Sequence, residues 1–463
     1  MKRHILYIIG ACSLLAGCNL YKNYERPEGL ANVEGLYRDT LSQEAALSAA
    51  DTTNFGCMPW REVFTDPQLQ TLIEKALVNN IDMKKAEYNI QKVEAGLKVA
   101  KLAYIPSIAF APQGTISSFD FGKASQTYSV PLSVSWNLGS MGSLRNTKKQ
   151  AQVSLLQMHA VKQATQTAII SGVANMYYTL EMLDEQLKTT HSTLAIWKRN
   201  VEVMEAMKEA GMVNEAAVGQ ARANYIELQA SVPQLESSIR EVENALCVLL
   251  DETPHTIERG SFASNEFPQQ LSAGIPVQLL TNRPDVRVAE LALASQFYGV
   301  NIARSAFYPS LNITGNGVWT NSAGGLILNP GKIIASAVAS VVQPIFANGQ
   351  LRAQLKIAKL DYEAAELDFR ERLLIAGQEV SNALSSYHTA NECLQLRERE
   401  VRQLEQTLAN VNELFLHTNT TSYLETLTAQ QSLLSAQLAL INDRYSKLQA
   451  GINLYKALGG GRE

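Results

Sequence analysis

Two stretches of the chain, residues 143–210 and 350–417, carry small and apolar residues at helical spacing and contain no proline. Each is 68 residues long, so as a helix each would span about 100 Å, several times the length of an average globular helix. Polar residues occupy the other faces, and such helices need neighbours on both sides to be stable. The pattern therefore predicts long helices packed side by side. The stripes include Leu156, Ala160, Ile170, Ala174 and Tyr177 in the first stretch and Leu351, Leu355, Leu360, Leu367 and Leu374 in the second.

Each long stretch ends at a short turn and is followed by a shorter helical pattern. The turns are residues 210–215 and 417–422, and the returning helices are expected at about 216–250 and 423–458. Pro233 lies inside the first returning helix, where a proline should kink the helix or break it locally. The sequence thus predicts two helical hairpins.

Residues 107–138 and 310–345 change to a period of two, which indicates β-strands. They contain four candidate strands of roughly ten residues each, the length that crosses a bilayer when the strand is tilted. In the clearest strand, apolar side chains alternate with small polar ones. The apolar set is Tyr128, Val130, Leu132, Val134, Trp136 and Leu138, and the polar set is Ser129, Ser133, Ser135 and Asn137.

Aromatic residues fall near the ends of these strands, where membrane proteins place their interfacial girdles. We expect Phe110 and Trp136 at one end of the sheet and Tyr128 and Trp319 at the other. A soluble pair of β-hairpins, with one face on a hydrophobic core, is the alternative that this pattern leaves open.

The order of strand, strand, long helix, turn and returning helix occurs twice. Residues 207 apart correspond, so that Gly142 matches Gly349 and Arg145 matches Arg352. This period is too long for a solenoid and indicates a duplicated protomer whose halves lie side by side. Helix-to-strand corners are expected at Pro106 and Pro309, a strand-to-helix corner at Pro344 and Gly349, and a structural junction that opens the second copy at Arg283, Pro284 and Asp285.

The chain therefore divides into four parts in sequence order. A signal peptide occupies residues 1–17 and an N-terminal linker residues 18–59. The first structural repeat is expected at 60–275, with strands at about 107–138 and a helical hairpin at about 143–250, and the second at 276–463, with strands at about 310–345 and a helical hairpin at about 350–458.

The N-terminus has the form of a secretory signal. Basic residues precede a short apolar run from Ile5 to Leu15, and small residues follow. The run is too short to span a bilayer as a helix. The segment Leu15-Ala16-Gly17-Cys18 resembles the bacterial lipobox, which implies cleavage before Cys18 and fatty acyl groups, palmitate among them, on its sulfur and new N-terminus. An ordinary signal peptide with a chance cysteine is the alternative.

The number of strands limits how this chain can enter a membrane. No apolar run of 18 or more residues follows residue 18, so a transmembrane helix is not expected. Four strands cannot close a barrel, and an open sheet edge cannot stay in lipid. Several chains must therefore pool their strands, two chains giving eight and three giving twelve. The polar face of the strands points to a water-filled interior.

Composition and motifs point away from catalysis and from nucleic acid. The chain of 463 residues has a net charge of −4, which does not favour nucleic-acid binding. Its six histidines do not stand at zinc-ligand spacing, and no P-loop, GxGxxG or GxSxG motif is present. We expect no enzyme activity and no cofactor other than the covalent lipid. Cys247 and Cys393 lie in helical runs and are expected to be small buried residues.

Short motifs from residue 60 onward resemble those of TolC-type outer-membrane factors, in the lipidated NodT-like branch of RND efflux systems. They are Phe64-Thr65-Asp66-Pro67-Gln68-Leu69, Ile105-Pro106-Ser107, Val232-Pro233-Gln234-Leu235-Glu236, Asn244-Ala245-Leu246, Ile275-Pro276, Leu279-Leu280, Arg283-Pro284-Asp285-Val286-Arg287-Val288-Ala289-Glu290, Ala303-Arg304, Tyr308-Pro309-Ser310 and Pro344-Ile345-Phe346 through Gly349. Similar proteins usually carry glycine where this chain has Asp251 and often where it has Thr418. The strand-to-helix corner at Trp136 to Gly142 also departs from the more acidic corner usual there.

The resemblance implies a membrane α+β fold. It implies a homotrimer with a twelve-stranded outer-membrane β-barrel, four strands per chain, continued by a long periplasmic α-helical coiled-coil barrel. The partners that it implies are a periplasmic adaptor (a membrane fusion protein), an inner-membrane RND transporter and outer-membrane lipid, with no nucleic acid.

The function that it implies is the exit duct of a tripartite efflux system, which passes small molecules across the outer membrane. A duct for type I protein secretion or another pump system is an alternative, and a surface-tethered coiled-coil scaffold without a pore is an alternative of another class. The two helix turns are the expected periplasmic gate or adaptor contacts, although they fit simple turn formers as well, and Gly211 is expected to cap its helix in the left-handed conformation. The candidate positions are Gly211, Val213, Asn214, Glu215, Thr418, Asn419, Thr421 and Ser422.

Overall fold

The structure is a computed structural model that describes most of the chain after the N-terminal linker. The described residues are 21–27, 55–118, 120–122, 124–140, 142–262, 267, 282–321, 333–417 and 423–462. The chain divides into two compact units, and each unit draws on both sequence repeats. The sheet unit comprises Met1–Asn32, Tyr88–His159 and Val288–Glu371, and the helix unit comprises Val33–Glu87, Ala160–Arg287 and Arg372–Glu463.

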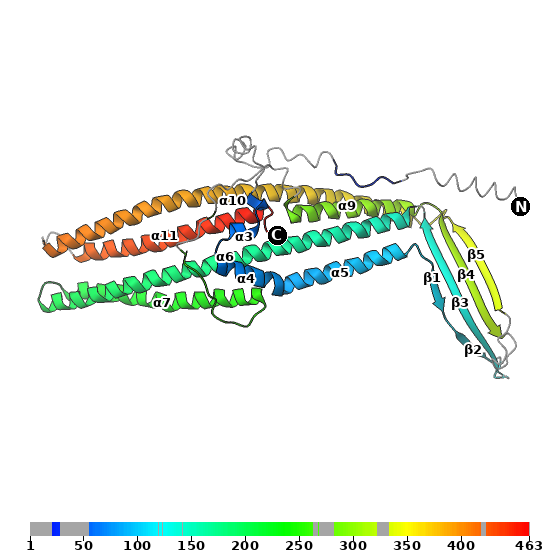
Figure 1. The fold of residues 1–463 in the computed structure, drawn as a ribbon, viewed down its shortest axis with the longest axis horizontal. Coiled ribbons are helices and arrows are strands. Elements are labelled where there is room, and N and C mark those ends of the chain that lie inside the picture. The colour runs from blue at the N-terminus through cyan, green and yellow to red at the C-terminus, as the bar shows by residue number, and fades with distance from the viewer. Residues whose placement is uncertain are drawn as a thin grey trace. The chain divides into compact units, whose positions relative to one another are not determined.

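The sheet unit is built on one antiparallel sheet. Its strands are β1 (Ser107–Phe110), β2 (Gln113–Ser117), β3 (Ser125–Ser140), β4 (Ser310–Asn321) and β5 (Ile333–Val342). Their order is β1–β3–β4–β5, and β2 also pairs with β3 (Figure 1). The pairing of β3 with β4 joins the first sequence repeat to the second.

The register of the sheet separates polar from apolar side chains. Ser133 lies opposite Asn316, and Ser135 lies opposite Thr314. Because successive side chains of a strand point to opposite faces, these pairs share one face, and Leu132 lies with Trp136 on the other. The alternation expected from the sequence therefore corresponds to two chemically different faces.

The aromatic residues do not all lie at the expected levels. Tyr128 is opposite Asn321 and Trp319 is opposite Val130, so these two rings do lie near one end of the β3–β4 pair. The expectation that Phe110 lies level with Trp136 is wrong, because Phe110 pairs with Leu132, four residues away along β3. The reason is that β1 starts at Ser107, opposite Ser135, so that Phe110 is the fourth residue along its strand. A break at residues 111–112, where a proline lacks an N–H, also splits the expected first strand into β1 and β2 without shifting their register against β3.

Four helices adjoin this sheet in the sequence. They are α5 (Ile81–Leu102), α6 (Ser143–Glu209), α9 (Pro284–Ser305) and α10 (Gln350–His417). Gly142 and Gly349 directly precede α6 and α10 and have φ angles of 81° and 78°, a conformation that favours glycine. Their carbonyls accept the first helical hydrogen bonds, from Asn146 and Ala353, each at 3.0 Å. The duplication inferred from the sequence thus extends to the backbone at these helix starts.

An extended segment before the first repeat, residues 21–27, runs along α9; we call it the strap. Arg26 forms a bidentate ion pair with Glu290, at 2.7 and 2.8 Å. Tyr24 stacks edge-on against Phe297, with ring centroids 5.8 Å apart. Tyr21 covers Gly142 so closely that a Cβ there would come within 2.3 Å of its ring. The strap therefore lies with its first residue, Tyr21, at the start of α6 and its later residues along α9.

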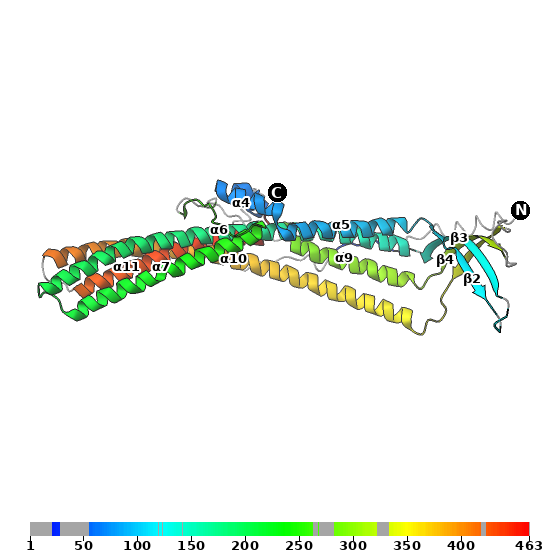
Figure 2. The same ribbon diagram turned by 90° about the horizontal axis from the view of Figure 1, so that it is seen from below.

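The helix unit contains two helical hairpins. The first joins α6 to α7 (Glu215–Leu250), and the second joins α10 to α11 (Tyr423–Ala457). Their helices lie side by side in Figures 1 and 2. Trp197, Leu228 and Leu434 form one buried cluster, which connects α6, α7 and α11. The short helices α3 (Trp60–Val63) and α4 (Pro67–Asn79) also belong to this unit.

Two helix features differ from the simplest expectation. Helix α7 continues through Pro233 without a break. Asp251, in place of the usual glycine, ends α7 in the left-handed conformation, with φ of 59°. The N–H groups of Asp251 and Glu252 donate to the carbonyls of Val248 and Cys247, at 3.2 and 2.9 Å, which completes a Schellman motif. The turn geometry is therefore kept, and Lys84 pairs with the Asp251 carboxylate at 3.3 Å.

The C-terminal glycines are packed inside the helix unit. Thr167 of α6 donates to the Gly460 carbonyl at 2.7 Å. The Tyr455 hydroxyl accepts from the Gly461 N–H and donates to the Met58 carbonyl, both at 2.8 Å. A Cβ at Gly459 would come within 2.6 Å of the Asn282 carbonyl oxygen, so the close approach requires glycine. These contacts hold the end of α11 against α6, against Met58 just before the first repeat and against Asn282 just before α9.

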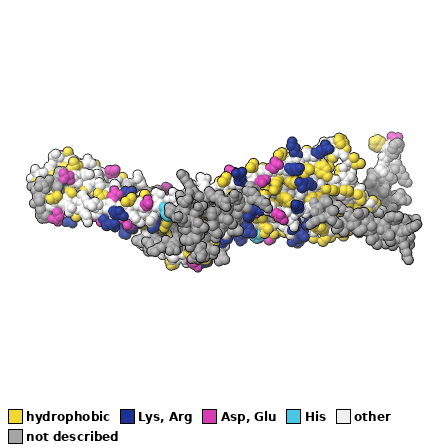
Figure 3. Space-filling model, turned by 90° about the horizontal axis from the view of Figure 1, so that it is seen from above, with side chains coloured by type: hydrophobic (Ala, Val, Ile, Leu, Met, Phe, Trp, Pro, Cys, Tyr) yellow, Lys and Arg dark blue, Asp and Glu magenta, His cyan; other side chains and the backbone are white. Residues whose placement is uncertain are grey.

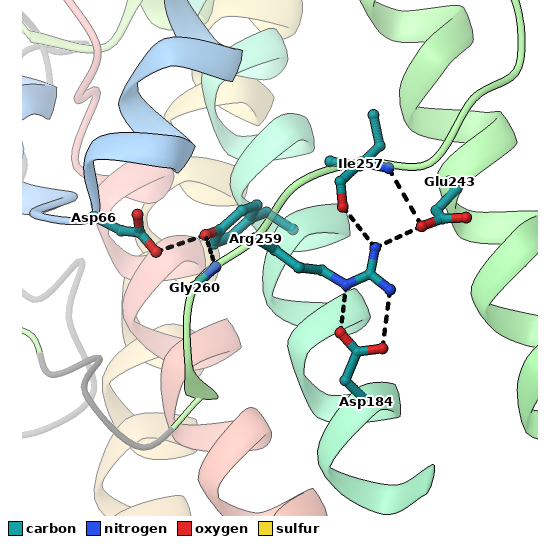
Figure 4. Close-up of polar contacts among 7 residues, drawn as sticks. Asp66, Asp184, Glu243, Ile257, Arg259 and Gly260 are labelled. Atoms are coloured by element: carbon teal, nitrogen blue, oxygen red, sulfur yellow. Dashed lines mark hydrogen bonds and ion pairs between the residues drawn. The ribbon is translucent and has the colours of Figure 1, made fainter. Parts of the chain in front are cut away.

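A polar network fastens the connection after α7 to three other segments (Figure 4). Arg259 bonds the Asp184 carboxylate of α6 through two nitrogens and the Glu243 carboxylate of α7 through a third. The Tyr177 hydroxyl donates to Asp66 at 2.6 Å and accepts from the Gly260 N–H at 2.8 Å. The side chains of Arg259 and Glu243 are only 13% and 9% exposed, so this guanidinium compensates a carboxylate that is largely shielded from water.

Cys247 is buried, as expected, whereas Cys393 is exposed and the expectation for it is wrong. The sequence around Cys393 predicts a helix, but it does not show which face of α10 packs against other helices.

None of the helices in the described parts of the chain combines the length and the apolar character needed to cross a membrane.

We predict that Arg259→Gln destabilises the protein by about 3 kcal/mol, because it leaves the buried Glu243 carboxylate with the Ile257 N–H but without its cationic partner. The melting temperature of the full chain in detergent measures the effect. Arg222→Gln is the matched control, since Arg222 pairs with Glu205 on the exposed surface and exposed pairs contribute little. Equal losses for the two variants would contradict the role given to the network.

Candidate functional site

The first hairpin tip, residues 210–215, is a closed turn that needs no partner to hold its shape. Helix α6 ends at Glu209, and Gly211 follows in the left-handed conformation with φ of 72°, as expected. The Gly211 N–H donates to the Lys208 carbonyl and the Met212 N–H to the Met207 carbonyl, both at 2.9 Å. These two bonds are the Schellman pair, so the last carbonyls of α6 are satisfied within the turn.

The start of α7 is capped from the same turn. The Asn214 side chain accepts from the Ala217 N–H at 3.0 Å, which makes Asn214 the N-cap. Val213 precedes the cap and packs against the cluster of Met204, Val218 and Ala221. A contact between the residue before the cap and the helix's fourth residue is a hydrophobic staple, and it sets the angle at which the chain enters α7.

Ion pairs tie the two helices together beside the tip. Lys208 pairs with Glu215 across the turn, and Arg222 pairs with Glu205 at 2.6 Å. The hydrogen bond and the charge of Lys208 lower the pKa of Glu215. Met212 is an apolar residue that takes no part in these ion pairs, and its side chain is 63% exposed. The tip therefore presents one flexible apolar side chain on a rigid turn.

The second hairpin tip falls between α10, which ends at His417, and α11, which begins at Tyr423. Thr418, Asn419, Thr421 and Ser422 lie outside the described residues. On the helices that lead into this turn, Leu414 and Leu424 are exposed. The candidate gate can therefore be built in detail only at the first tip.

The junction residue Arg283 is 5% exposed and has hydrogen-bond partners from three directions. It bonds both oxygens of Asp285, at 3.0 and 2.7 Å, the Glu379 carboxylate of α10 at 2.5 Å and the Ala457 carbonyl of α11 at 2.9 Å. Pro284 is the first residue of α9, where its missing N–H is not needed. Arg283 thus holds the start of α9 against the middle of α10 and the end of α11.

Asp285 completes this junction. It accepts from the Val286 N–H at 2.9 Å and from Arg372 of α10 at 3.1 Å. Burial opposes its ionisation, but the hydrogen bonds and charge of Arg283 outweigh that effect and lower the pKa of Asp285. The carboxylate is therefore engaged on both oxygens, an arrangement that suits a structural role better than ligand binding.

The corner residues lie where helices meet strands. Pro106 stands between the end of α5 and the start of β1, and Pro309 between α9 and β4. Pro344 follows β5, and Gly349 caps α10. At each corner the proline precludes continuation of the hydrogen-bonding pattern. Cys18 lies outside the described residues.

Sequence reasoning missed a row of polar contacts between the two hairpins. Helix α6 meets α11 through Thr179 with Tyr445 at 2.9 Å, Gln186 with Asn442 at 3.0 Å and Asn200 with Gln430 at 2.7 Å. The three α6 residues are separated by seven and fourteen residues. This heptad spacing of polar side chains is the feature of the sequence that could have revealed the contacts. Amide pairs of this kind fix the register of neighbouring helices more selectively than apolar contacts do.

In the described part of the chain, no three His, Cys, Asp or Glu side chains are grouped so that they could hold a metal ion. The candidate positions lie in turns, junctions and helix faces.

Outer membrane efflux proteins resemble this chain in sequence and in structure over almost its whole length. The toluene efflux pump outer membrane protein TtgC of Pseudomonas putida is 30% identical, over 100% of this chain and 96% of that protein. The cation efflux system protein CusC of Escherichia coli K12 is 28% identical, over 96% and 97%. Among solved structures, the MtrE outer membrane channel of Neisseria gonorrhoeae, in its open state, has a TM-score of 0.85 at 25% identity, over 96% of this chain and 99% of that chain.

The solved CusC channel has a TM-score of 0.83 at 26% identity, over 96% of this chain and 100% of that chain. The family model described as outer membrane efflux protein matches residues 72–251 and 275–460, which include both hairpins and all the strands. By this match, the chain belongs to the outer membrane efflux protein family.

Proposed function

We propose that this protein is the outer-membrane exit duct of a tripartite efflux system, fed by an inner-membrane RND pump through a periplasmic adaptor. The observation that carries the proposal is the sheet with one polar and one apolar face, joined directly to long helical hairpins. The apolar face suits lipid and the polar face suits a water-filled passage. Relatives named for pumps of toluene, antibiotics and cations support small molecules as cargo. We assign the chain no catalytic role.

We further propose that three chains assemble head to tail into a twelve-stranded barrel, in which β1 and β2, lying end to end along β3, together form one of the four strands of each chain. In the described sheet, β1 and β5 are at opposite ends and each pairs on one side only. Unpaired backbone groups are costly in hydrocarbon, so each edge needs a strand from another copy. A contact between β5 of one chain and β1 of the next satisfies both edges and repeats around a closed ring.

The helices connected to these two edge strands each carry a row of exposed apolar side chains. Helix α10 follows β5, and its Leu360, Leu367 and Leu374 are exposed at seven-residue spacing. Helix α5 precedes β1, and its exposed Tyr88 and Leu102 stand fourteen residues apart, at the same repeat. Seven-residue spacing is the pattern of coiled-coil seams. We infer that α10 of one copy packs against α5 of the next and continues the strand-to-strand seam.

The two tips are, in this proposal, the gate and the adaptor contact at the periplasmic end. The first tip has its backbone bonds satisfied internally, so it moves as a rigid turn on two helices. The polar row between α6 and α11 gives the hairpins a defined resting register. Opening then requires the hairpins to shift against each other rather than the turn to unfold.

The seam is tested by Leu367→Glu, which places a charge at the centre of the α10 stripe, where Leu367 is 67% exposed in the single chain. We expect loss of the trimer, because the seam would bury an unpaired carboxylate. Light scattering on the detergent complex gives the mass. Gln354→Glu adds the same charge to an exposed α10 position off the stripe and should leave the trimer intact. A trimeric Leu367→Glu protein would contradict the seam.

The gate is tested by cysteines placed in both tips, Met212→Cys with Thr418→Cys, in a chain whose exposed Cys57 and Cys393 are replaced by serine. Disulfides between neighbouring chains should close the channel, since they prevent the hairpins from separating. Conductance in planar bilayers, before and after reduction, measures closure. Ser237→Cys, at an exposed position of α7 that lies 22 residues beyond Glu215, is the control position. Unchanged conductance after verified crosslinking would remove the gate assignment.

Lipid attachment at Cys18 is tested by Cys18→Ala and metabolic labelling with a radioactive fatty acid. We expect loss of all acyl label in the variant, since Cys18 provides both the sulfur and the new N-terminus. Retained label would disprove attachment at this residue, while Cys57→Ala should keep the label and serves as the matched control.

A further inference from the structure

Charge changes abruptly where the sheet meets the helices. The five strands contain no Asp, Glu, Lys or Arg. In the adjoining helix ends, residues 95–102, 143–159, 291–305 and 350–360, there are nine basic residues and no acidic one. The nine are Lys98, Lys101, Arg145, Lys148, Lys149, Arg304, Arg352, Lys356 and Lys359. We call this set the basic band.

The band lies within about three helical turns of the sheet on every helix. Most of its members, including Arg304, Arg352 and Lys359, are exposed. Farther along α10, basic and acidic residues are interspersed, and some of them form ion pairs, such as Arg372 with Asp285 and Arg397 with Asp443. Figure 3 shows Lys and Arg side chains set among hydrophobic ones over the region of α9 and α10. The positive charge near the sheet is therefore not balanced by acidic residues of the same helix ends.

Exposed aromatic and apolar side chains occupy the corners between the strands and the band. Tyr104, Phe307 and Tyr308 are each more than a third exposed, and Phe346 is 84% exposed. Tyr and other aromatic rings are enriched where hydrocarbon meets headgroups. The order along the chain is thus uncharged sheet, exposed aromatic corner and basic band. This order matches the depth profile of one membrane interface.

The strap indicates which side of the helices faces outward. Tyr21 lies only three residues after Cys18, and Arg304 is among its charged neighbours. Tyr362 of α10 packs against Phe297, the ring that Tyr24 also contacts. Lys359 stands one turn before Tyr362 and Arg352 two turns before Lys359, so both lie toward the same side of α10. If Cys18 carries the proposed acyl chain, that chain enters lipid outside the passage, and the strap would then place these three basic residues toward the surrounding membrane.

We propose that the basic band binds the anionic phosphate headgroups of phospholipids in the leaflet nearest the helices. This inference rests on the proposed function, because it takes the sheet as the membrane-crossing part. Arginine suits phosphate through paired N–H donors, and clustered Lys and Arg at a membrane surface attract anionic lipids. The band fixes how deeply the sheet sits, while the aromatic corners mark the boundary of the hydrocarbon.

The test uses the full chain in bilayers of phosphatidylcholine, with spin-labelled phosphatidylglycerol or spin-labelled phosphatidylcholine as the probe. The immobilised fraction of each probe gives the relative affinity of the protein for the two headgroups. We expect a preference for phosphatidylglycerol that falls toward one at high salt, since exposed charges are screened. The variant Arg304→Gln, Arg352→Gln, Lys359→Gln should lose the preference, by up to about fivefold for each charge removed.

The matched control is Arg370→Gln, Arg399→Gln, Arg402→Gln, which removes the same charge from exposed positions farther along α10. It should keep the lipid preference. An equal loss in both triple variants would overturn the band as the binding site, as would a preference that is absent in the unaltered protein. Binding of soluble polyglutamate in place of phosphatidylglycerol would overturn the inference in favour of an acidic protein partner.

Conductance of the same preparations separates this inference from the proposed function. A protein that conducts but shows no headgroup preference refutes the basic band alone. A protein that neither conducts nor assembles refutes the proposed exit duct, and the inference about the basic band, which rests on it, then fails as well.

Discussion

The ladder between β3 and β4 is the interaction on which the rest of the structure depends. It pairs the first repeat with the second, from Tyr128 opposite Asn321 to Ser140 opposite Ser310. A one-residue slip would exchange the two faces of the sheet. The register is therefore what places hydroxyls and amides together on one face. It also leaves β1 and β5 as edges, which is the physical basis for proposing that several copies close the sheet.

The helices follow from the same duplication. Gly142 and Gly349 start α6 and α10 with matching backbone geometry, although their side-chain surroundings differ, since only Gly142 lies under a tyrosine of the strap. The repeats then diverge where the hairpins meet other segments. The first is fastened through Arg259 and Tyr177, and the second through Arg283 and Tyr455. Two buried arginines at different places in the two repeats thus fasten the hairpins, each with its own partners.

These anchors separate rigid parts from parts that can move. The buried guanidinium of Arg283 holds the start of α9 and the end of α11 against the middle of α10, and the packed C-terminal glycines add to this contact. The tip of the first hairpin is closed by its own cap and staple. Between them, α6 and α11 are joined partly by amide and hydroxyl pairs, whose hydrogen bonds can be exchanged for water when the helices shift. Export through a gated passage would use motion in this stretch.

Local pattern by itself determined the helices, the strand alternation and the duplication. Helix α10 begins and ends at the residues expected from periodicity, and Gly211 adopts the left-handed cap, because both depend on neighbours within a few residues. Only the tertiary structure decided the features that rest on distant partners. The break between β1 and β2 appears against β3, and Cys393 proves exposed because the packing of α10 leaves its side open. The ion network of Arg259 joins residues as far as 75 positions apart. Such contacts leave no periodic signal in one sequence, since each requires the chain to be folded before its members meet.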